Sequence, residues 1–286
     1  MPQNLRDIRR RIRSVTNTQQ ITKAMQMVAA AKLRGAQERA EAARPYAEAM
    51  REALADLTAR GGTLRHPFFE ARDVRRAAYV VISADKGLAG PYNANVIRAA
   101  LAAMRERPKP LALAVGRKAR DAFRRLGVEI AESFIELGDH PSFETARSIA
   151  VPAMNLYLDG RADEVYLVYN RFVNAVTHRP TVLRLLPLAA EARGGERKPG
   201  PEVQFEPDAE SVLAALLPHY VASILYGALL EAKASEHGAR MTAMDAATKN
   251  ARELIESLTL LGNRVRQASI TKEIAEIVSG AEALKG

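Results

Sequence analysis

The sequence contains no cysteine and no tryptophan, and aromatic residues make up 5% of its 286 residues. Without cysteine the chain can form no disulfide, offers no thiol nucleophile and cannot bind a metal through thiolates. Scarce aromatics are typical of alanine-rich helix pairs rather than of β-sandwiches or β-barrels. Hydrophobic residues still reach 48%, so a chain of this length can bury the core of one large or two modest domains.

Motifs of enzymes are also missing. The sequence has neither of the common glycine-rich phosphate-binding motifs, no nucleophile elbow, and no two histidines at a metal-ligand spacing. The most enzyme-like segment is Ser83–Gly90 (SADKGLAG), which follows a predicted strand. Its glycines could bind a phosphate at the start of a helix, or they could simply make the turn. We expect the turn, and therefore no catalytic residue, no cofactor and no metal ion.

What the sequence does contain is a heptad pattern at both ends. Apolar and small residues recur at alternating intervals of three and four, which is typical of a coiled coil. The N-terminal seam consists of Leu5, Ile8, Ile12, Val15, Gln19, Thr22, Gln26, Ala29, Leu33, Ala36, Ala40, Ala43, Ala47, Met50, Leu54 and Leu57. The C-terminal seam consists of Met244, Ala247, Ala251, Leu254, Leu258, Leu261, Val265 and Ala268. We expect the two ends to pair with each other as an antiparallel coiled coil.

Three stretches of these seams are unusual. Gln19, Thr22 and Gln26 are polar at core positions, where they could set the register or meet outside partners. The seam from 29 to 47 is mostly alanine, which predicts a slim and closely packed pair. After Ala268 the phase breaks, and a new stripe follows in Ile270, Ile274, Ile277, Ala281 and Leu284. This stripe lies where the N-terminal helix should end, so it would face water unless another protein covers it.

The middle of the chain alternates between strand and helix patterns. Strands are predicted at 77–83, 111–115, 128–135, 165–171 and 177–186, and helices at 93–105, 117–126 and 142–158. This alternation predicts a parallel or mixed sheet covered by helices, and hence the α/β class. We expect an N-terminal coiled-coil helix at 1–60 with a kink or a short break at Pro45, an α/β domain at 75–190, a linker or foot loop at 191–208, and a C-terminal coiled-coil helix at 209–286.

The charge is strongly basic and unevenly placed. The formal net charge is +9, and residues 1–34 contain eight basic residues against Asp7 alone. Such a block favours an acidic partner, whether nucleic acid, anionic lipid or an acidic protein surface, although it could also be a solvated helix face. One alternative function is therefore a basic coiled-coil nucleic-acid-binding protein. The uncharged stretch 211–230 is long enough to span a bilayer, but Pro218, His219 and its acidic flanks favour a buried helix.

Four segments carry a resemblance to a known family. They are Ser14–Leu33 (SVTNTQQITKAMQMVAAAKL), Ser83–Gly90, Ala234–Met244 (ASEHGARMTAM) and Arg266–Ala281 (RQASITKEIAEIVSGA). Together they make the chain similar to the gamma subunit of F-type ATP synthases over nearly its whole length. The resemblance implies an antiparallel coiled coil with an inserted Rossmann-like α/β domain. It also implies a non-catalytic central rotor of a bacterial-type enzyme, which couples ion-driven rotation to conformational change at the catalytic sites.

The resemblance further implies partners and contact residues. The paired helices would pass along the axis of the alpha and beta subunits with the C-terminal tip in an apolar bearing. The α/β domain would lie near the epsilon subunit, and the foot would rest on the c-ring, so that the chain meets the cell membrane peripherally, on the cytoplasmic side, and binds no nucleic acid. Met25, Arg264, Gln267, Thr271 and Glu273 fall in stretches that would touch beta subunits. Phe205 and Glu206 resemble part of the foot that contacts the ring.

The sequence departs from the family pattern in two places. The plant form has a redox-regulatory insertion with a cysteine pair, and the absence of cysteine here excludes thiol control of that kind. Phe205 stands where some relatives have tyrosine, which puts any hydroxyl contact at that position in doubt.

Overall fold

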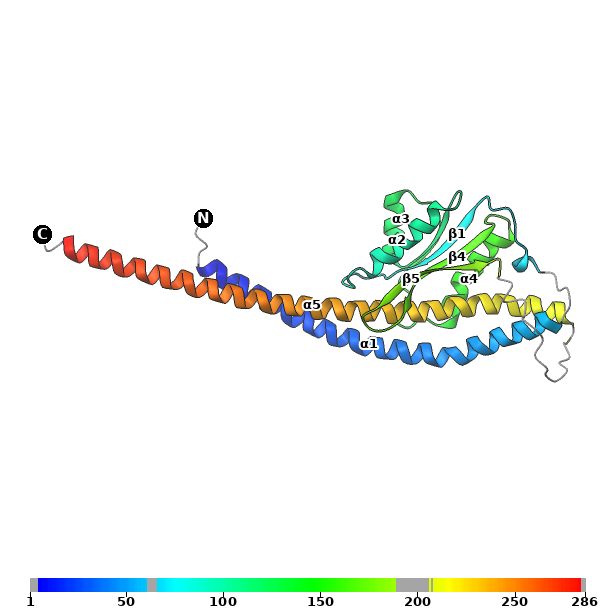
Figure 1. The fold of residues 1–286 in the computed structure, drawn as a ribbon, viewed down its shortest axis with the longest axis horizontal. Helices are drawn as coiled ribbons and strands as arrows, with labels where there is room; N and C mark the ends of the chain where they lie inside the picture. Colours follow the sequence, from blue (N-terminus) through cyan, green and yellow to red (C-terminus); the bar gives the residue numbers. More distant parts are fainter. Residues whose placement is uncertain (1–4, 61–65, 189–205, 207, 284–286) are drawn as a thin grey trace. The chain divides into compact units, whose positions relative to one another are not determined.

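The structure is a computed structural model that describes residues 5–60, 66–188, 206 and 208–283. By their internal contacts the residues form two compact units, one of 1–28 with 241–286 and the other of 29–240. Two long helices, α1 (Leu5–Arg60) and α5 (Ala209–Ala283), contribute to both units. The sheet and the shorter helices belong to the second unit (Figure 1).

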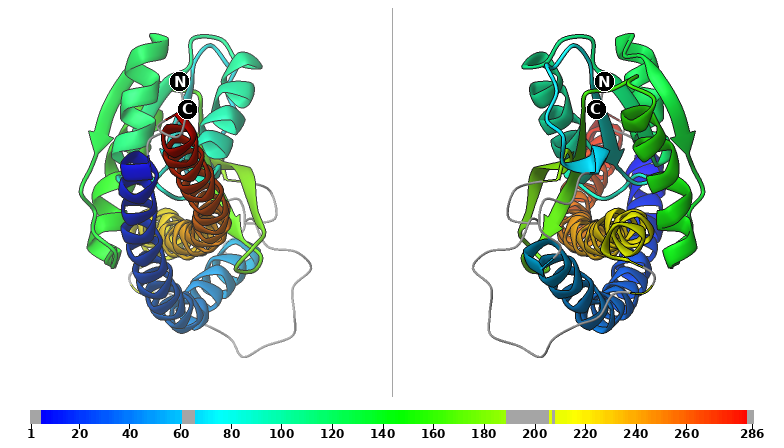
Figure 2. Two further views of the ribbon diagram at one scale, coloured as in Figure 1. Left: turned by 90° about the vertical axis from the view of Figure 1, so that its left-hand side faces the viewer. Right: turned by 90° about the vertical axis from the view of Figure 1, so that its right-hand side faces the viewer.

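Both long helices continue through a proline. Pro45 lies inside α1 and Pro218 inside α5, and neither interrupts the helix. The short break considered at Pro45 does not occur, because α1 continues as one helix through that residue (Figure 2). A proline removes one backbone hydrogen bond and crowds the preceding turn. A helix with many neighbours can absorb that cost by bending, because tertiary packing supplies most of its stability.

The second unit contains a five-stranded mixed sheet in the order β3-β2-β1-β4-β5. Its strands are β1 (Ala77–Ile82), β2 (Leu111–Val115), β3 (Ile130–Phe134), β4 (Glu164–Phe172) and β5 (His178–Leu186). The first four strands in sheet order pair in parallel, and β5 joins β4 as an antiparallel edge strand. The predicted mixed sheet is confirmed, and the order β3-β2-β1-β4 is that of a dinucleotide-binding half-domain.

Helices cover both faces of this sheet. One face of β1, formed by Ala77, Tyr79 and Val81, shares a core with α2 (Tyr92–Arg105) and α3 (Arg117–Leu126). The opposite face packs against α4 (Phe143–Leu158), the first turns of α5, and a short 3-10 helix, η1 (Pro67–Phe69). Because β1 is buried on both faces, its sequence is a continuous apolar run rather than an alternating one.

The ends of two helices follow local sequence signals. Ser142 caps α4, where its Oγ accepts a hydrogen bond from the backbone N–H of Thr145 at 3.1 Å. Gly127 ends α3 in the left-handed conformation that suits glycine. Both ends agree with the predicted helix ranges 117–126 and 142–158 to within one residue.

The apolar start of α5 is part of the core. Among the described residues, α5 is the one helix long and apolar enough to cross a membrane by length and composition. Its apolar residues from 213 to 229 are nevertheless buried against the sheet and α1, and include Leu213, Leu217, Val221, Leu225 and Leu229. Packing within the protein therefore accounts for this hydropathy, as Pro218, His219 and the acidic flanks predicted.

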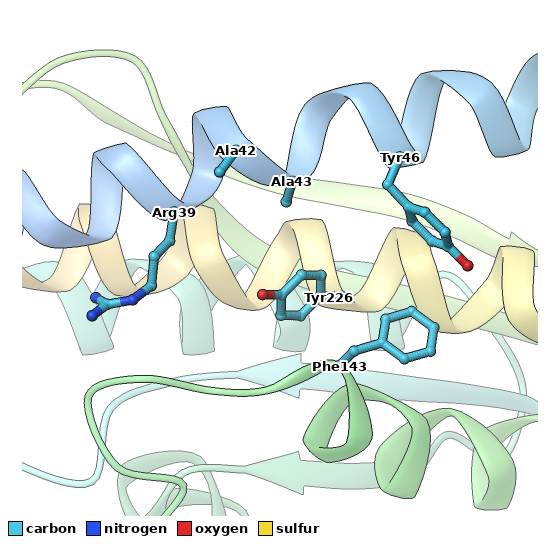
Figure 3. Close-up of a pocket in the computed structure, with 6 residues that line it drawn as sticks. All are labelled: Arg39, Ala42, Ala43, Tyr46, Phe143 and Tyr226. Carbon is cyan, nitrogen blue, oxygen red and sulfur yellow. The ribbon is translucent and has the colours of Figure 1, made fainter.

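The alanine section of α1 does not pack as closely as predicted. Ala29 and Ala36 are buried, but Ala43 and Ala47 are only partly buried. Here a cavity of about 410 Å³ opens between α1, α4 and α5 (Figure 3). Its lining consists of Arg39, Ala42, Ala43, Tyr46, Phe143 and Tyr226. Alanine side chains fill little space here, and aromatic rings border the opening, with the centroids of the Tyr46 and Phe143 rings 6.0 Å apart.

Candidate functional site: an exposed helical tip and a buried ionic cluster

The first unit is an antiparallel pair of helices. Ile8 of α1 lies beside Gly262 of α5, because a Cβ added to that glycine would lie 3.4 Å from Ile8 Cγ2. Further along α1, Thr22 faces Thr248. Residue numbers along α5 therefore decrease as those along α1 increase, which confirms the antiparallel pairing predicted from the two seams.

Polar residues of the seam bond across this pair. The Thr22 hydroxyl lies 2.8 Å from the Thr248 hydroxyl, and Thr22 is 8% exposed. One turn further along, Gln26 Nε2 donates to Asp245 Oδ1 at 3.0 Å. Polar groups that must meet across a helix pair fix its register, because a slip would leave them unpaired. Of the two roles considered for these residues, the contacts of Thr22 and Gln26 favour the setting of register.

The seam on α5 differs from the predicted one at two positions, Leu254 and Ala268, of which Ala268 is exposed beyond the end of the pair. Met244, Ala251 and Leu258 are buried as predicted. Leu254, however, is 47% exposed, and Ile255 is partly buried in its place. Steps of three-then-four and four-then-three between 251 and 258 both satisfy a heptad pattern. The sequence pattern alone therefore could not choose between Leu254 and Ile255.

Beyond the pair, α5 continues alone as an exposed tip, which we define as residues 266–282. Since Ile8 lies beside Gly262, the described start of α1 at Leu5 leaves these residues without a neighbouring helix, and every side chain in the tip is exposed. The apolar side chains Ile270, Ile274 and Ile277 are 49%, 56% and 71% exposed and recur on one helical face. The exposed stripe predicted after Ala268 is thus confirmed for Ile270, Ile274 and Ile277, whereas Leu284 lies outside the described residues. An exposed apolar stripe of this kind marks a protein-binding surface.

The predicted contact residues occupy three places. Arg264, Gln267, Thr271 and Glu273 are exposed on the last turns of α5. Some of these side chains bond locally: Thr271 Oγ1 donates to the Gln267 carbonyl at 3.0 Å, and Ser269 Oγ donates to Glu273 Oε1 at 3.3 Å.

Two of the other predicted residues, Met25 and Glu206, lie elsewhere. Met25 is partly buried on α1, next to Gln26, which bonds to Asp245. It is therefore roughly 30 Å along the pair from Gln267, at 1.5 Å per helical residue, so the structure does not bring these residues together. Glu206 is exposed in the second unit, and Phe205 lies outside the described residues.

The second unit contains a buried ionic cluster that the sequence patterns did not single out. Glu236 of α5 is 4% exposed. Its Oε1 accepts a hydrogen bond from Arg240 Nη2 at 2.8 Å, and its Oε2 accepts one from Lys233 Nζ at 3.1 Å. Arg240 Nη2 also donates to the Gly87 carbonyl at 3.2 Å. The cluster therefore ties α5 to the loop that follows β1.

A second ionic contact lies beside this cluster. Lys32 Nζ of α1 lies 2.6 Å from Asp139 Oδ2, in the loop before α4. Burial opposes ionisation of Asp139, but the hydrogen bond and charge of Lys32 lower the pKa of that carboxyl. His237 Nε2 lies 3.7 Å from Asp139 Oδ1, and burial lowers the pKa of His237 to about 4. His237 is therefore neutral at pH 7, and the ion pair here is the one between Lys32 and Asp139.

Helix α5 closes the crevice in which a fold of this kind would bind a nucleotide. The crevice lies beyond the carboxyl ends of β1 and β4, at the point where the strand order reverses. There the Tyr92 hydroxyl donates to the Ala232 carbonyl at 3.0 Å, and Ser235 Oγ donates to the Asn170 carbonyl at 3.0 Å. The remaining cavity measures about 10 Å³, whereas ligand pockets typically measure about 300–1,000 Å³.

The segment Ser83–Gly90 therefore serves as a turn, the second of the two roles considered for it and the one expected. Asp85 is held locally, since Oδ1 accepts from the backbone N–H of Arg117 at 2.9 Å and Oδ2 from that of Glu136 at 3.0 Å. Within the described parts of the chain, no group of three or more His, Asp or Glu side chains could hold a metal ion.

Two of the segments that carry the family resemblance meet in this region. Ala239, from the segment Ala234–Met244, packs with Ala84, Ala89 and Tyr92. The same segment supplies Glu236, His237 and Arg240. The two motifs Ser83–Gly90 and Ala234–Met244 were thus the available sequence signal for the cluster. They did not reveal that the two segments contact each other.

Long N- and C-terminal helices that pair with each other, with an α/β domain inserted between them in the sequence, define the class of this protein as a coiled coil with an inserted α/β domain. A sequence profile described as ATP synthase matches residues 4–284. The ATP synthase gamma chain of Desulforamulus reducens is 54% identical over 282 residues, 98% of this chain and 99% of the relative. That of Moorella thermoacetica is 54% identical over 283 residues, with 99% of each chain covered. The chain therefore belongs to the ATP synthase gamma-chain family.

Solved structures agree with this assignment. A chain from the central stalk and c-ring structure of the Tetrahymena thermophila mitochondrial ATP synthase matches with a TM-score of 0.61 and 29% identity, covering 79% of this chain and 99% of that one. A chain from the Euglena gracilis mitochondrial ATP synthase matches in fold, with a TM-score of 0.70 and 22% identity over 98% of this chain and 94% of that one. The alternative of a basic nucleic-acid-binding protein has no support among these matches.

Proposed function

We propose that this chain is the non-catalytic central rotor of a bacterial-type F-type ATP synthase. It couples ion-driven rotation of the c-ring to conformational change at the catalytic sites of the alpha and beta subunits. The observation that carries the proposal is the tip, where α5 continues past its partner helix with Ile270, Ile274 and Ile277 exposed on one face. In a gamma chain this is the part that would turn in an apolar bearing formed by the head.

The tip has the right chemistry for such a bearing. Burying one isoleucine side chain contributes roughly 1.5–3 kcal/mol, so three of them supply several kcal/mol for seating in an apolar sleeve. Apolar contacts are also non-directional, and a turning surface needs contacts that do not lock at one angle. A single helix with polar groups on its other faces fulfils both requirements.

We place the contacts with the catalytic subunits along the first unit. Met25 on α1 and Arg264, Gln267, Thr271 and Glu273 on α5 are the proposed contacts with beta subunits. The basic residues of 1–34 would then face acidic surfaces of these partners, which aids recognition and orientation more than it adds affinity. The helix pair is asymmetric, so as it turns it meets three equivalent catalytic sites in three different ways.

We place the entry of torque in the second unit. Phe205 and Glu206 are the proposed foot contacts with the c-ring, and the α/β domain is the proposed neighbour of the epsilon subunit. In this view 1–60 and 209–286 act as the coiled coil, 75–190 as the α/β domain and 191–208 as the foot loop. The ionic cluster around Glu236 and the pair of Lys32 with Asp139 would pass torque from the α/β domain to both helices. Separating a buried charge from its partner costs free energy, so these contacts resist sliding.

As a gamma chain the protein is part of a membrane-bound complex. We propose that it lies on the cytoplasmic side of the cell membrane and is held there peripherally, through the c-ring. The core packing of α5 supports a peripheral rather than a membrane-spanning position.

The experiment that tests this function is reconstitution with alpha and beta subunits. ATP should drive rotation of a bead attached to the α/β domain of this chain. The isolated chain should hydrolyse no ATP, and the native protein should co-purify with a large ATPase. Elution of the native protein alone, or turnover of ATP by the pure chain, would refute the proposal, and tight salt-sensitive DNA binding would favour the nucleic-acid alternative instead.

A further inference from the structure

A second concave site lies at the opposite end of the sheet from the closed crevice. A cavity of about 520 Å³ opens where β1 and β4 begin. Its lining, which we call the basic pocket, consists of Arg72, Asp73, Arg75, Arg76, Lys109, Gly160, Arg161 and Asp163. Five cations thus surround two carboxylates, and every lining residue belongs to the second unit.

The carboxylates in this pocket do not neutralise its cations. Asp163 Oδ2 accepts hydrogen bonds from the backbone N–H groups of Arg75 and Arg76, at 2.8 and 2.9 Å. This oxygen therefore binds the backbone rather than a guanidinium group. Arg76 pairs instead with Glu129, outside the pocket, at 2.5 Å. Among the described residues, no carboxylate lies within 4.0 Å of the charged groups of Arg75, Lys109 and Arg161.

Two of the cations are held in place. Arg72 Nη1 donates to the Tyr157 carbonyl at 2.8 Å, and its guanidinium lies 4.6 Å from the centre of the Tyr157 ring. Its remaining N–H groups are free to bind a ligand. Lys109 stands between Pro108 and Pro110 with a φ of 45°, a conformation that a side-chain-bearing residue adopts rarely and at a cost. The flanking prolines stiffen the loop and so restrict the position of the lysine Cα, from which the side chain extends.

Unneutralised like charges in one concavity repel each other. Two unit charges 4 Å apart interact by about 1 kcal/mol in water and about 4 kcal/mol near a protein surface. A bound polyanion turns this repulsion into attraction. Guanidinium groups match the geometry of phosphate oxygens, and a lysine adds a point charge. The volume also lies within the range of small-ligand pockets, which is about 300–1,000 Å³.

We propose that the basic pocket binds a phosphate-bearing ligand through Arg72, Arg75, Lys109 and Arg161. Phosphate in this position could belong to a soluble polyphosphate or to the headgroup of an anionic phospholipid. The pocket lies at the end of the second unit where η1 packs against the first turns of α5. The lipid source rests on the proposed function, in which this end faces the c-ring and the membrane, whereas the phosphate site itself does not.

The test compares two triple variants of the full-length chain. The pocket variant is Arg75→Gln, Lys109→Gln and Arg161→Gln. The matched control is Lys118→Gln, Arg124→Gln and Arg125→Gln, which removes the same charge from exposed positions on α3. Calorimetric titration with tripolyphosphate should give an affinity about tenfold or more lower for the pocket variant, and within about twofold of wild type for the control. Sedimentation with phosphatidylcholine vesicles, with and without phosphatidylglycerol, forms the second arm.

Each outcome decides the question. Loss of tripolyphosphate binding in the pocket variant alone supports the site. If phosphatidylglycerol vesicles then bind the wild type and not the pocket variant, the source is a lipid headgroup, and if vesicles do not bind, it is a soluble phosphate. Equal losses in both variants would overturn the proposal, because the binding would then reflect net charge. Stronger competition by poly-glutamate than by tripolyphosphate would also overturn it, in favour of an acidic protein segment. None of these results depends on rotation, so the rotor proposal is tested separately.

Discussion

The hydroxyl groups of Thr22 and Thr248 lie 2.8 Å apart across the paired helices, although 226 residues separate them in the sequence. Thr248 can also donate to the Met244 carbonyl, and Thr22 to that of Gln19. The variant Thr22→Val should therefore destabilise the chain by about 1 kcal/mol, since one hydroxyl loses a partner in a partly buried place. The double variant with Thr248→Val should cost less than the two single changes together, because no polar group is left unpaired. Urea denaturation of all four proteins measures this coupling, and strictly additive costs would contradict it.

A larger effect is expected at Glu236. Replacing it by glutamine leaves Lys233 and Arg240 without their buried counter-charge. Removing one partner of a buried ion pair typically costs about 3–5 kcal/mol. The matched control is Glu256→Gln, which breaks an exposed pair with Arg252 on the same helix and should cost less than about 1 kcal/mol. Thermal unfolding distinguishes the two, and similar melting temperatures for both variants would show that the cluster does not stabilise the fold.

The sequence predicted the elements of this fold much better than the contacts between them. Periodicity located both long helices and the end of their pairing, since a heptad seam reports directly on which face is buried. It could not show that a cavity opens beside Ala42 and Ala43, because spacing says nothing of distance. Nor could it show that Arg240 meets the Gly87 carbonyl, because these two residues are far apart in sequence. The spacing of Lys233, Glu236 and Arg240 is local, but their burial and their link to the loop after β1 are set by the fold.

The stability of the chain should fall in mild acid because of His237. Burial lowers the pKa of this side chain to about 4, partly offset by Glu236 and Asp139, while Arg240 and Lys233 lower it further. Above pH 6.5 the histidine is neutral in both folded and unfolded chains, so its contribution is constant. As the pH falls from about 6.5 to about 4 only the unfolded chain takes up the proton, and stability is lost. The loss approaches about 3 kcal/mol at most, from about 1.4 kcal/mol for each pKa unit.

The variant His237→Gln isolates this effect. Its free energy of unfolding should depend less on pH between 6.5 and 4 than that of the wild type, whatever the absolute stability of the variant. Denaturant titrations at a series of pH values give both curves. Parallel curves over this window would mean that His237 does not titrate as the structure implies.

Gly116 should tolerate no side chain. Its φ is 90°, and a Cβ at this position would lie 2.3 Å from the carbonyl oxygen of Ser83. The carbonyl belongs to the backbone at the end of β1 and cannot move without disturbing the sheet. Gly116→Ala should therefore destabilise the second unit by several kcal/mol, more than the roughly 1–3 kcal/mol of an unfavourable φ alone.

Gly280→Ala is the control for this substitution. Gly280 lies in helix α5 with open space around its Cα, so alanine there should stabilise the helix by roughly 0.5–1 kcal/mol. Circular dichroism during thermal unfolding records both variants. Equal stability of Gly116→Ala and wild type would contradict the close approach of Gly116 to Ser83.

The tip should matter to the assembled enzyme and not to the isolated chain. Ile270, Ile274 and Ile277 are all at least 49% exposed, so changing the three to serine removes little buried surface from the chain. Its free energy of unfolding should change by less than about 1 kcal/mol, as is usual for exposed positions. In a complex with alpha and beta subunits the same change removes several kcal/mol of apolar contact, so torque and the retention of the chain in the head should both fall.

The variant Lys272→Ser with Glu276→Ser breaks only an exposed pair on the polar side of this helix, and it should leave torque near the wild-type value. Wild-type torque from the triple isoleucine variant, measured by rotation of an attached bead, would show that this apolar face is not the bearing surface.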